Sequence, residues 1–277
     1  MSVAVDSQSP PTAVAWERRL LFATLASIPT LPALVLAVVF ADGAAASAAW
    51  VKPVKFSLSL IVYLATLALM AGYLPERTRE ARWFAIYTWV VIACIWLELL
   101  WVSAAAFMGV PSHFNTAFPW SVLYGIAGLM AVMLTSAAAV YAIALAWTRD
   151  STAPSPIRLG FIIGGLATFV LTLVTAGYLG GNGGHHVGVE PDGAPVWPFF
   201  GWSTTVGDLR PAHFLATHAI QLLPLLAILF MAGLRRPGPA VILVGAGYCA
   251  VTLAVFAEAL MGRPFLSLID IQRVLAL

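Results

Sequence analysis

Residues 83–108 read WFAIYTWVVIACIWLELLWVSAAAFM, a stretch in which Glu98 is the single charged residue. The stretch begins directly after Arg82, and an uncharged run continues beyond its end. A helix needs about 20 consecutive, mostly apolar residues to cross a bilayer. The stretch meets that requirement, and it therefore predicts a transmembrane helix.

The chain on either side contains further apolar runs, each bounded by charged residues. The uncharged run after Glu98 is too long for one helix, and Pro111 and Pro119 divide it around the turn-like segment 112–115. We therefore predict an all-α fold, a polytopic transmembrane helix bundle that occupies residues 20–262. Its seven spans are expected near residues 20–41, 56–75, 83–108, 119–147, 159–180, 213–234 and 240–261.

The composition agrees with a membrane protein. Hydrophobic residues make up 61% of the chain, charged residues 9%, and the mean hydropathy is +0.93. Soluble domains carry about 25% charged residues, so the composition excludes an ordinary soluble protein, a disordered chain and a nucleic-acid-binding protein. Two cysteines cannot form a disulfide framework. The sequence also lacks a glycine-rich phosphate-binding motif, which argues against a nucleotide-driven pump.

Lysine and arginine placement predicts the orientation, because these residues favour the cytoplasmic side of a membrane. With the N-terminus inside, nine of the 14 basic residues fall in inner segments and five in outer segments. The predicted orientation is therefore N-in and C-out. Residues 1–19 then form a cytoplasmic tail, residues 180–212 a long outer loop, and residues 263–277 an outer tail.

Two local patterns predict contacts within the bundle. Gly160 and Gly164, followed by Gly165, give the fifth span a small-residue face suited to close helix packing; Gly125 and Gly128 are candidates for the same role in the fourth span. Asp208, at the end of the long loop, is placed to cap the sixth span, where a negative charge meets the positive end of the helix dipole.

Ionisable side chains gather in the half of the bundle that this orientation places outside. Glu98 and Glu258 lie within the third and seventh spans at similar depth, and all five histidines lie at the same end. Ionisable residues inside a membrane are costly and by default indicate a functional site. Helical periodicity places polar side chains of the second, third and sixth spans on narrow faces. We therefore predict an outward-facing polar pocket whose candidate residues are Lys55, Glu98, His113, His213, His218, Gln221 and Glu258.

Each of these residues also has a purely structural interpretation. The lysines near the second span can extend to the membrane interface, and the two intramembrane acids can be protonated packing residues. His218 and His213 are candidate metal ligands, but they are five residues apart, unlike the His-Glu-x-x-His pair of zinc enzymes. The sequence leaves these alternatives open.

Three segments resemble parts of uncharacterised bacterial seven-helix integral membrane proteins. They are Trp50–Phe56 (WVKPVKF), Ser112–Asn115 (SHFN), and the region from Gly201-Trp202-Ser203-Thr204-Thr205 to Gln221. The similarity would cover most of the chain after residue 20. It implies a multi-pass protein of the bacterial cell (inner) membrane, and no activity or residue role is carried over from it.

Several classes of function fit these features. The first is a membrane protein that binds a cofactor or small ligand in the outer pocket, with haem, a metal ion or a pigment as the leading candidates and a redox role as an extension. The second is a non-catalytic subunit of a larger membrane complex, with other membrane subunits as partners besides the lipid bilayer. The third is a small-solute transporter or channel. The sequence does not decide whether the protein is an enzyme, although the absence of lysine from the seventh span excludes a retinal Schiff base.

Overall fold

The structure, a computed structural model, describes residues 16–265. Most of the expected cytoplasmic tail (residues 1–15) and most of the expected outer tail (residues 266–277) lie outside the described residues.

Seven helices or helix pairs in the described part are long and apolar enough to cross a membrane, which confirms the predicted all-α bundle and its seven spans. The protein is a polytopic membrane protein whose helices contact the lipid bilayer. The first span consists of two helices, α1 and α2. The helices of the described part are α1 (Arg18–Ser27), α2 (Thr30–Phe40), α3 (Ala44–Gly72), α4 (Glu76–Arg79), α5 (Arg82–Phe107), α6 (Trp120–Trp147), α7 (Ser155–Gly181), α8 (Arg210–Gly233) and α9 (Pro237–Leu260).

Two of the spans differ from their predicted form. The first is interrupted at residues 28–29, where Pro29 separates α1 from α2; a proline cannot donate the backbone hydrogen bond that a continuous helix needs. The second begins at Ala44 rather than Phe56 and accommodates Pro53 in its interior. This earlier start places the two lysines of the segment on a helix instead of in a loop.

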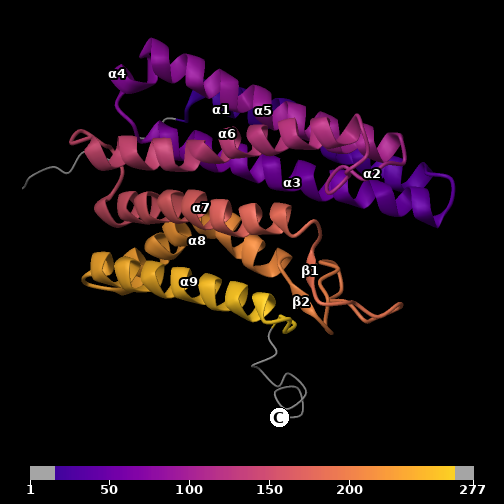
Figure 1. The fold of residues 1–277 in the computed structure, drawn as a ribbon. Helices are drawn as coiled ribbons and strands as arrows, with labels where there is room; N and C mark the ends of the chain where they lie inside the picture. Colours follow the sequence, from indigo (N-terminus) through magenta and orange to yellow (C-terminus); the bar gives the residue numbers. More distant parts are fainter. Residues whose placement is uncertain (1–15, 266–277) are drawn as a thin grey trace, which may run out of the picture.

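The helices pack approximately in chain order into two groups. In Figure 1, α1, α3, α5 and α6 lie in the upper part of the view and α7, α8 and α9 in the lower part, and α6 packs against α7 where the two groups meet. The connection between α2 and α3 lies at the same end of the bundle as the two short strands β1 (His186–Val187) and β2 (Gly207–Asp208). We call this the loop end of the bundle; the expected orientation would place it outside.

Close helix contacts confirm the small-residue face of α7. A Cβ atom added to Gly160 would lie 2.7 Å from Cα of Pro224, and one added to Gly164 would lie 2.7 Å from the carbonyl oxygen of Ala219, both on α8. Gly165 approaches α6 in the same way, at the carbonyl oxygen of Ala138. The expectation for α6 was wrong, because Cβ atoms on Gly125 and Gly128 would meet no atom within 4 Å.

Hydrogen bonds between side chains join α5 to α6 in the interior. The hydroxyl oxygens of Thr88 and Tyr141 lie 2.9 Å apart, and both residues are fully buried. Nearer the surface of the bundle, the hydroxyl oxygens of Tyr87 and Ser136 lie 2.6 Å apart. These contacts set the rotation of α5, and this rotation turns Glu98, three turns further along the helix, into the protein rather than toward lipid.

Candidate functional site at the loop end of the bundle

A cluster of polar side chains joins α3 to the connection between α5 and α6. Lys52 on α3 donates from Nζ to the hydroxyl oxygen of Ser112 at 2.8 Å, and its Nζ lies 3.0 Å from Nδ1 of His113. Ser112 is buried, and its carbonyl oxygen accepts a hydrogen bond from the indole nitrogen of Trp101 at 3.0 Å. The indole thereby holds the segment that supplies both partners of the lysine. We call Lys52, Ser112, His113 and Glu98 the lysine cluster.

Glu98 on α5 is the acidic member of the lysine cluster. It is 4% exposed, and its Oε1 atom has no hydrogen-bond partner among residues 16–265. Lys52 is the basic side chain that interacts with it electrostatically. The sequence placed Lys55 and three histidines in one predicted pocket with this acid, but Lys52, which was not among the candidates, is the lysine that lies near it.

His113 is held in its neutral form by its surroundings. Burial, together with the positive charge of Lys52, lowers the pKa of His113 from 6.5 to about 3. Aromatic rings surround the imidazole: its centroid lies 6.0 Å from that of Phe56 and 5.4 Å from that of Tyr124. An ammonium group has no lone pair, so Nδ1 must accept from Lys52, and the neutral ring then carries its proton on Nε2.

Lys55, one helical turn beyond Lys52, contacts the long loop. Its amine donates to the carbonyl oxygen of Phe199 at 2.7 Å and lies 3.4 Å from that of Phe200. These bonds connect α3 to a loop segment that is distant in the sequence. Phe200 stacks on Trp202 with a centroid distance of 4.3 Å, so the lysine is tied to an aromatic part of the loop.

The candidate residues of α8 lie along the helix that follows this loop. Nδ1 of His213 lies 3.2 Å from the hydroxyl oxygen of Thr175 on α7. The ring of His218 packs on Phe214 at a centroid distance of 4.3 Å, and Oε1 of Gln221 is a buried atom without a hydrogen-bond partner in the described part of the chain.

Glu258 has a different setting. Its carboxylate lies 3.3 Å from the guanidinium of Arg263, at the end of α9, a helix that packs against α7 and α8. The structure therefore gives this acid a basic partner of its own.

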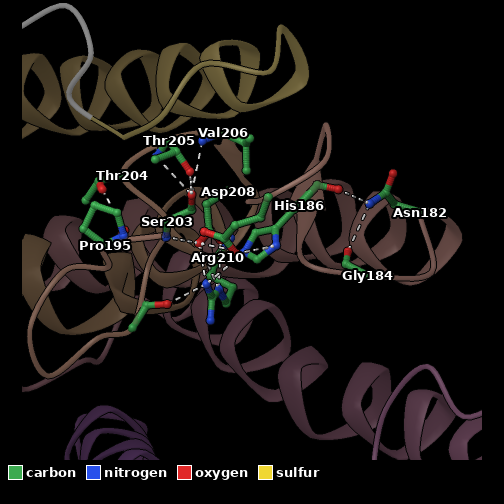
Figure 2. Close-up of polar contacts among 12 residues, drawn as sticks. Asn182, Gly184, His186, Pro195, Ser203, Thr204, Thr205, Val206, Asp208 and Arg210 are labelled. Atoms are coloured by element: carbon green, nitrogen blue, oxygen red, sulfur yellow. Dashed lines mark hydrogen bonds and ion pairs between the residues drawn. The ribbon is translucent and has the colours of Figure 1, made fainter. Parts of the chain in front are cut away.

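The long loop is fastened by a second polar group, which we call the loop clasp: His186, Asp208 and Arg210 (Figure 2). Asp208 is buried and accepts hydrogen bonds from the backbone nitrogens of Ser203 at 2.8 Å and Arg210 at 2.9 Å. Burial alone would raise the pKa of Asp208, but the hydrogen bonds and charge of Arg210 outweigh it and lower that pKa. Asp208 precedes the N-cap residue Leu209, and its bond to the first helical amide of α8 agrees with the expected capping role.

His186 connects the clasp to the first half of the loop. Its Nδ1 lies 3.1 Å from the carboxylate of Glu190, and its Nε2 lies 3.3 Å from the guanidinium of Arg210. His186 also pairs with Asp208 across the β1–β2 ladder. The clasp holds the two ends of the loop together, next to the end of α7 at Gly181 and the start of α8 at Arg210.

Within residues 16–265, no group of three or more histidine, cysteine or acidic side chains is arranged to hold a metal ion. His213 and His218 thus have no metal-binding group around them in this part of the chain. A groove of about 520 Å³ between the first span and α5 is lined by Ser27, Thr30, Trp96, Ser103 and apolar residues, and none of its lining residues belongs to the lysine cluster.

Sequence reasoning missed the roles of Lys52 and Ser112. Lys52 was treated as an interfacial residue, and Ser112 as part of a turn. Composition and spacing gave no signal for this pairing, because the two residues are 60 positions apart in the chain and meet only through the packing of α3 against the α5–α6 connection. No protein-family model, curated protein or solved structure matches the chain, so no family is identified for it.

Proposed function

We propose that this polytopic membrane protein binds a small organic ligand or cofactor at the lysine cluster, from the outer side of a bacterial inner membrane. The observation that carries the proposal is the setting of Glu98. The carboxylate of Glu98 is 4% exposed, and its Oε1 atom has no hydrogen-bond partner among the described residues. The amine of Lys52, the basic group near it, bonds to Ser112 and His113 instead.

This arrangement of Glu98 and Lys52 is energetically costly. Burying a charged group costs several kcal/mol unless partners compensate, and a buried acceptor without a donor costs about 1–3 kcal/mol or more. Lys52 is the natural partner, yet its amine is directed to Ser112 and His113. A purely structural acid would be expected either to form the direct ion pair or to be neutral and fully hydrogen-bonded, and Oε1 of Glu98 has no hydrogen-bond partner among residues 16–265. A ligand that donates to Glu98 supplies the missing interaction.

The cluster provides both halves of a binding site. Glu98 offers an acceptor, while Lys52 and Nε2 of His113 offer donors. Aromatic side chains from α3, α6 and the α5–α6 connection enclose the imidazole. Lys55 is linked to α8 through the long loop, because its amine bonds to the carbonyl oxygen of Phe199 and the ring of Phe200 packs on Phe214. The proposal extends the site toward His213, His218 and Gln221 on that helix. An organic ligand accounts for these groups without a metal ion.

The test compares the same substitution at two acids. Wild-type protein, Glu98→Gln and Glu258→Gln are purified in a mild detergent and examined by native mass spectrometry and by absorption spectroscopy. Glu258 is the control because it has its own partner in Arg263. We expect a stoichiometric bound small molecule in the wild type and in Glu258→Gln, and its loss from Glu98→Gln.

Size-exclusion profiles and melting curves establish that the variants are folded. Lys52→Met provides a second route to the same result, since it removes the donor on the other side of the site. The proposal is wrong if folded wild-type protein carries no molecule other than bulk lipid, or if Glu98→Gln retains the bound molecule at wild-type occupancy.

A further inference from the structure

The groove between the first span and α5 originates at the break in that span. α1 packs against α3 and α5, whereas α2, which follows the break at Pro29, packs mainly against α3 and has no buried residue. Because the first span leaves α5 after the break, a space of about 520 Å³ lies between them. Three leucines line this groove, together with the small or polar residues Ala26, Ser27, Thr30, Ala33, Trp96 and Ser103.

The polar side chains of the groove are hydrogen-bonded within the protein. Oγ of Ser27 donates to the carbonyl oxygen of Ala23 at 2.7 Å and accepts from the indole nitrogen of Trp96 at 3.1 Å. Oγ1 of Thr30 donates to the carbonyl oxygen of Ser27 at 2.7 Å, and Oγ of Ser103 donates at 2.7 Å to the carbonyl oxygen one turn before it. Each of these side chains has one donor. The lining residues therefore offer an occupant no free side-chain donor and no charge.

This lining favours hydrocarbon in the groove over water or a polar ligand. An ordered water needs two to four polar partners, and an empty space would deprive the lining atoms of dispersion contacts. Exposed apolar side chains adjoin the groove on both helices, since Leu100 is 63% exposed and Ile28 is 48% exposed. The groove is thus continuous with the surface through which the spans contact the bilayer.

The groove has the size of one hydrocarbon chain. At a rise of about 1.5 Å per residue, its lining extends about 12 Å along the first span and about 10 Å along α5, in the half of α5 nearest the loop end. One leaflet of the hydrocarbon core is about 15 Å thick, so the groove fits within a single leaflet. Spread over about 12 Å, its volume gives a cross-section of about 40 Å², roughly half of what a helix of 10–12 Å diameter requires.

We propose that an acyl chain of a phospholipid, from the leaflet at the loop end, occupies this groove. The chain lies along α5 between Trp96 and Ser103 and packs on its other side against Ala26 and Ala33. Van der Waals contact retains it, because lipid tails are as apolar as the lining and gain nothing from the hydrophobic effect. The chain thereby joins the first span to α5 beyond the break. The site is separate from the lysine cluster, so the inference goes beyond the proposed function.

The experiment counts the lipids that stay on the protein and locates them. The protein is reconstituted in vesicles of a phosphatidylcholine and a phosphatidylglycerol in equal parts, each with a photoactivatable diazirine in one acyl chain, and is then extracted and washed in a mild detergent. Native mass spectrometry counts the lipids that remain, and illumination followed by peptide mapping identifies the residues that they contact.

We expect one lipid per protein to survive the wash that removes the other lipids. Its cross-links should fall within residues 26–34 and 96–103, because these segments line the groove. The two headgroups should be retained equally, since the lining carries no charge.

The same substitution at two exposed alanines separates the groove from the general lipid-facing surface. In Ala33→Phe the ring takes the place of part of the chain, and overpacking of this kind corresponds to roughly tenfold weaker retention. Ala254→Phe is the matched control, because Ala254 is exposed on α9 at a similar distance from the loop end and does not line the groove. It should retain the lipid as the wild type does. Glu98→Gln should also retain it, which separates this result from ligand binding at the lysine cluster.

Melting curves establish that Ala33→Phe is folded, and the cross-link map of the wild type tests the groove without any variant. The proposal is overturned if the folded wild type retains no lipid, if the cross-links fall on other helix faces, or if Ala33→Phe retains as much lipid as Ala254→Phe. A marked preference for one headgroup would overturn it as well, because the retained lipid would then be held by a polar site elsewhere. A dimer whose groove residues stay unlabelled would assign the groove to a second copy of the chain.

Discussion

Nζ of Lys52 and Nδ1 of His113 lie 3.0 Å apart, so a lysine of α3 is bonded to a histidine that follows it by 61 residues. The bond joins two basic groups, and it requires a neutral histidine. The environment enforces that state, because burial and the nearby ammonium lower the pKa of His113 to about 3. This neutral imidazole has a consequence for stability at acid pH.

Acid should destabilise the folded protein through His113. The unfolded histidine takes up a proton near pH 6.5, whereas the folded one does so only near pH 3. Between these values the unfolded state binds more protons, so stability is fully present above about pH 6.5 and is lost as the pH falls, at about 1.4 kcal/mol per pH unit for each such group. Melting curves in detergent between about pH 4.5 and pH 7.5 measure the slope.

The variant His113→Phe should reduce that slope by about 1.4 kcal/mol per pH unit, because the phenyl ring keeps much of the packing and cannot titrate. His185→Phe should reduce it similarly, since burial and the charge of Arg210 lower the pKa of His185 to about 4. An unchanged slope in His113→Phe would mean that the imidazole is not neutral in the folded state.

The glycines of α7 should differ sharply in their tolerance of alanine. A Cβ on Gly164 would lie 2.7 Å from a backbone oxygen of α8, whereas a Cβ on Gly177 would meet nothing within 4 Å. We expect Gly164→Ala to cost about 1–3 kcal/mol through forced separation of the helices. Gly177→Ala should be neutral or slightly stabilising, because alanine is the better helix former. Melting temperatures of the two variants check this, and equal values would contradict the close contact.

The loop clasp should depend on the charge of Asp208. The variant Asp208→Asn removes the negative charge that Arg210 pairs with in a buried position, and breaking a buried pair costs about 3–5 kcal/mol. We expect faster chymotrypsin cleavage near Trp197, Phe199 and Phe200 and faster amide exchange in residues 183–206. Asp192→Asn is the matched control, because Asp192 is exposed in the same loop. The role of the clasp is contradicted if both variants are cleaved at the wild-type rate.

Cysteine labelling tests the orientation that the basic residues predict. A membrane-impermeant maleimide applied to intact cells should label Asp192→Cys, in the long loop, and should not label Glu80→Cys, between α4 and α5. Cys94 and Cys249 are replaced by alanine beforehand, so that each variant carries one reactive thiol. Labelling at residue 80 but not at residue 192 would reverse the topology and place the lysine cluster at the cytoplasmic side.

The number of spans and the presence of an acid within the third could be read from the sequence. Both depend only on residues that are neighbours in the chain, since the length of an apolar run and the charges that bound it decide whether a helix can cross a bilayer. The close contact of α7 was also predictable, because Gly160 and Gly164 recur on one helical face. Each of these conclusions depends on residues close together in the chain.

Only the tertiary structure decided which side chains meet. The sequence identified Lys55 and Glu98 as pocket residues. In the folded protein, Lys55 bonds to a carbonyl oxygen of the long loop, and Lys52 is the lysine near Glu98. That outcome depends on the early start of α3 at Ala44, on the rotation of α5 against α6, and on a turn that brings Ser112 and His113 to the amine. A hydropathy pattern contains none of this information, because the partner of a buried charge is set by the mutual rotation and depth of helices that are far apart in the chain.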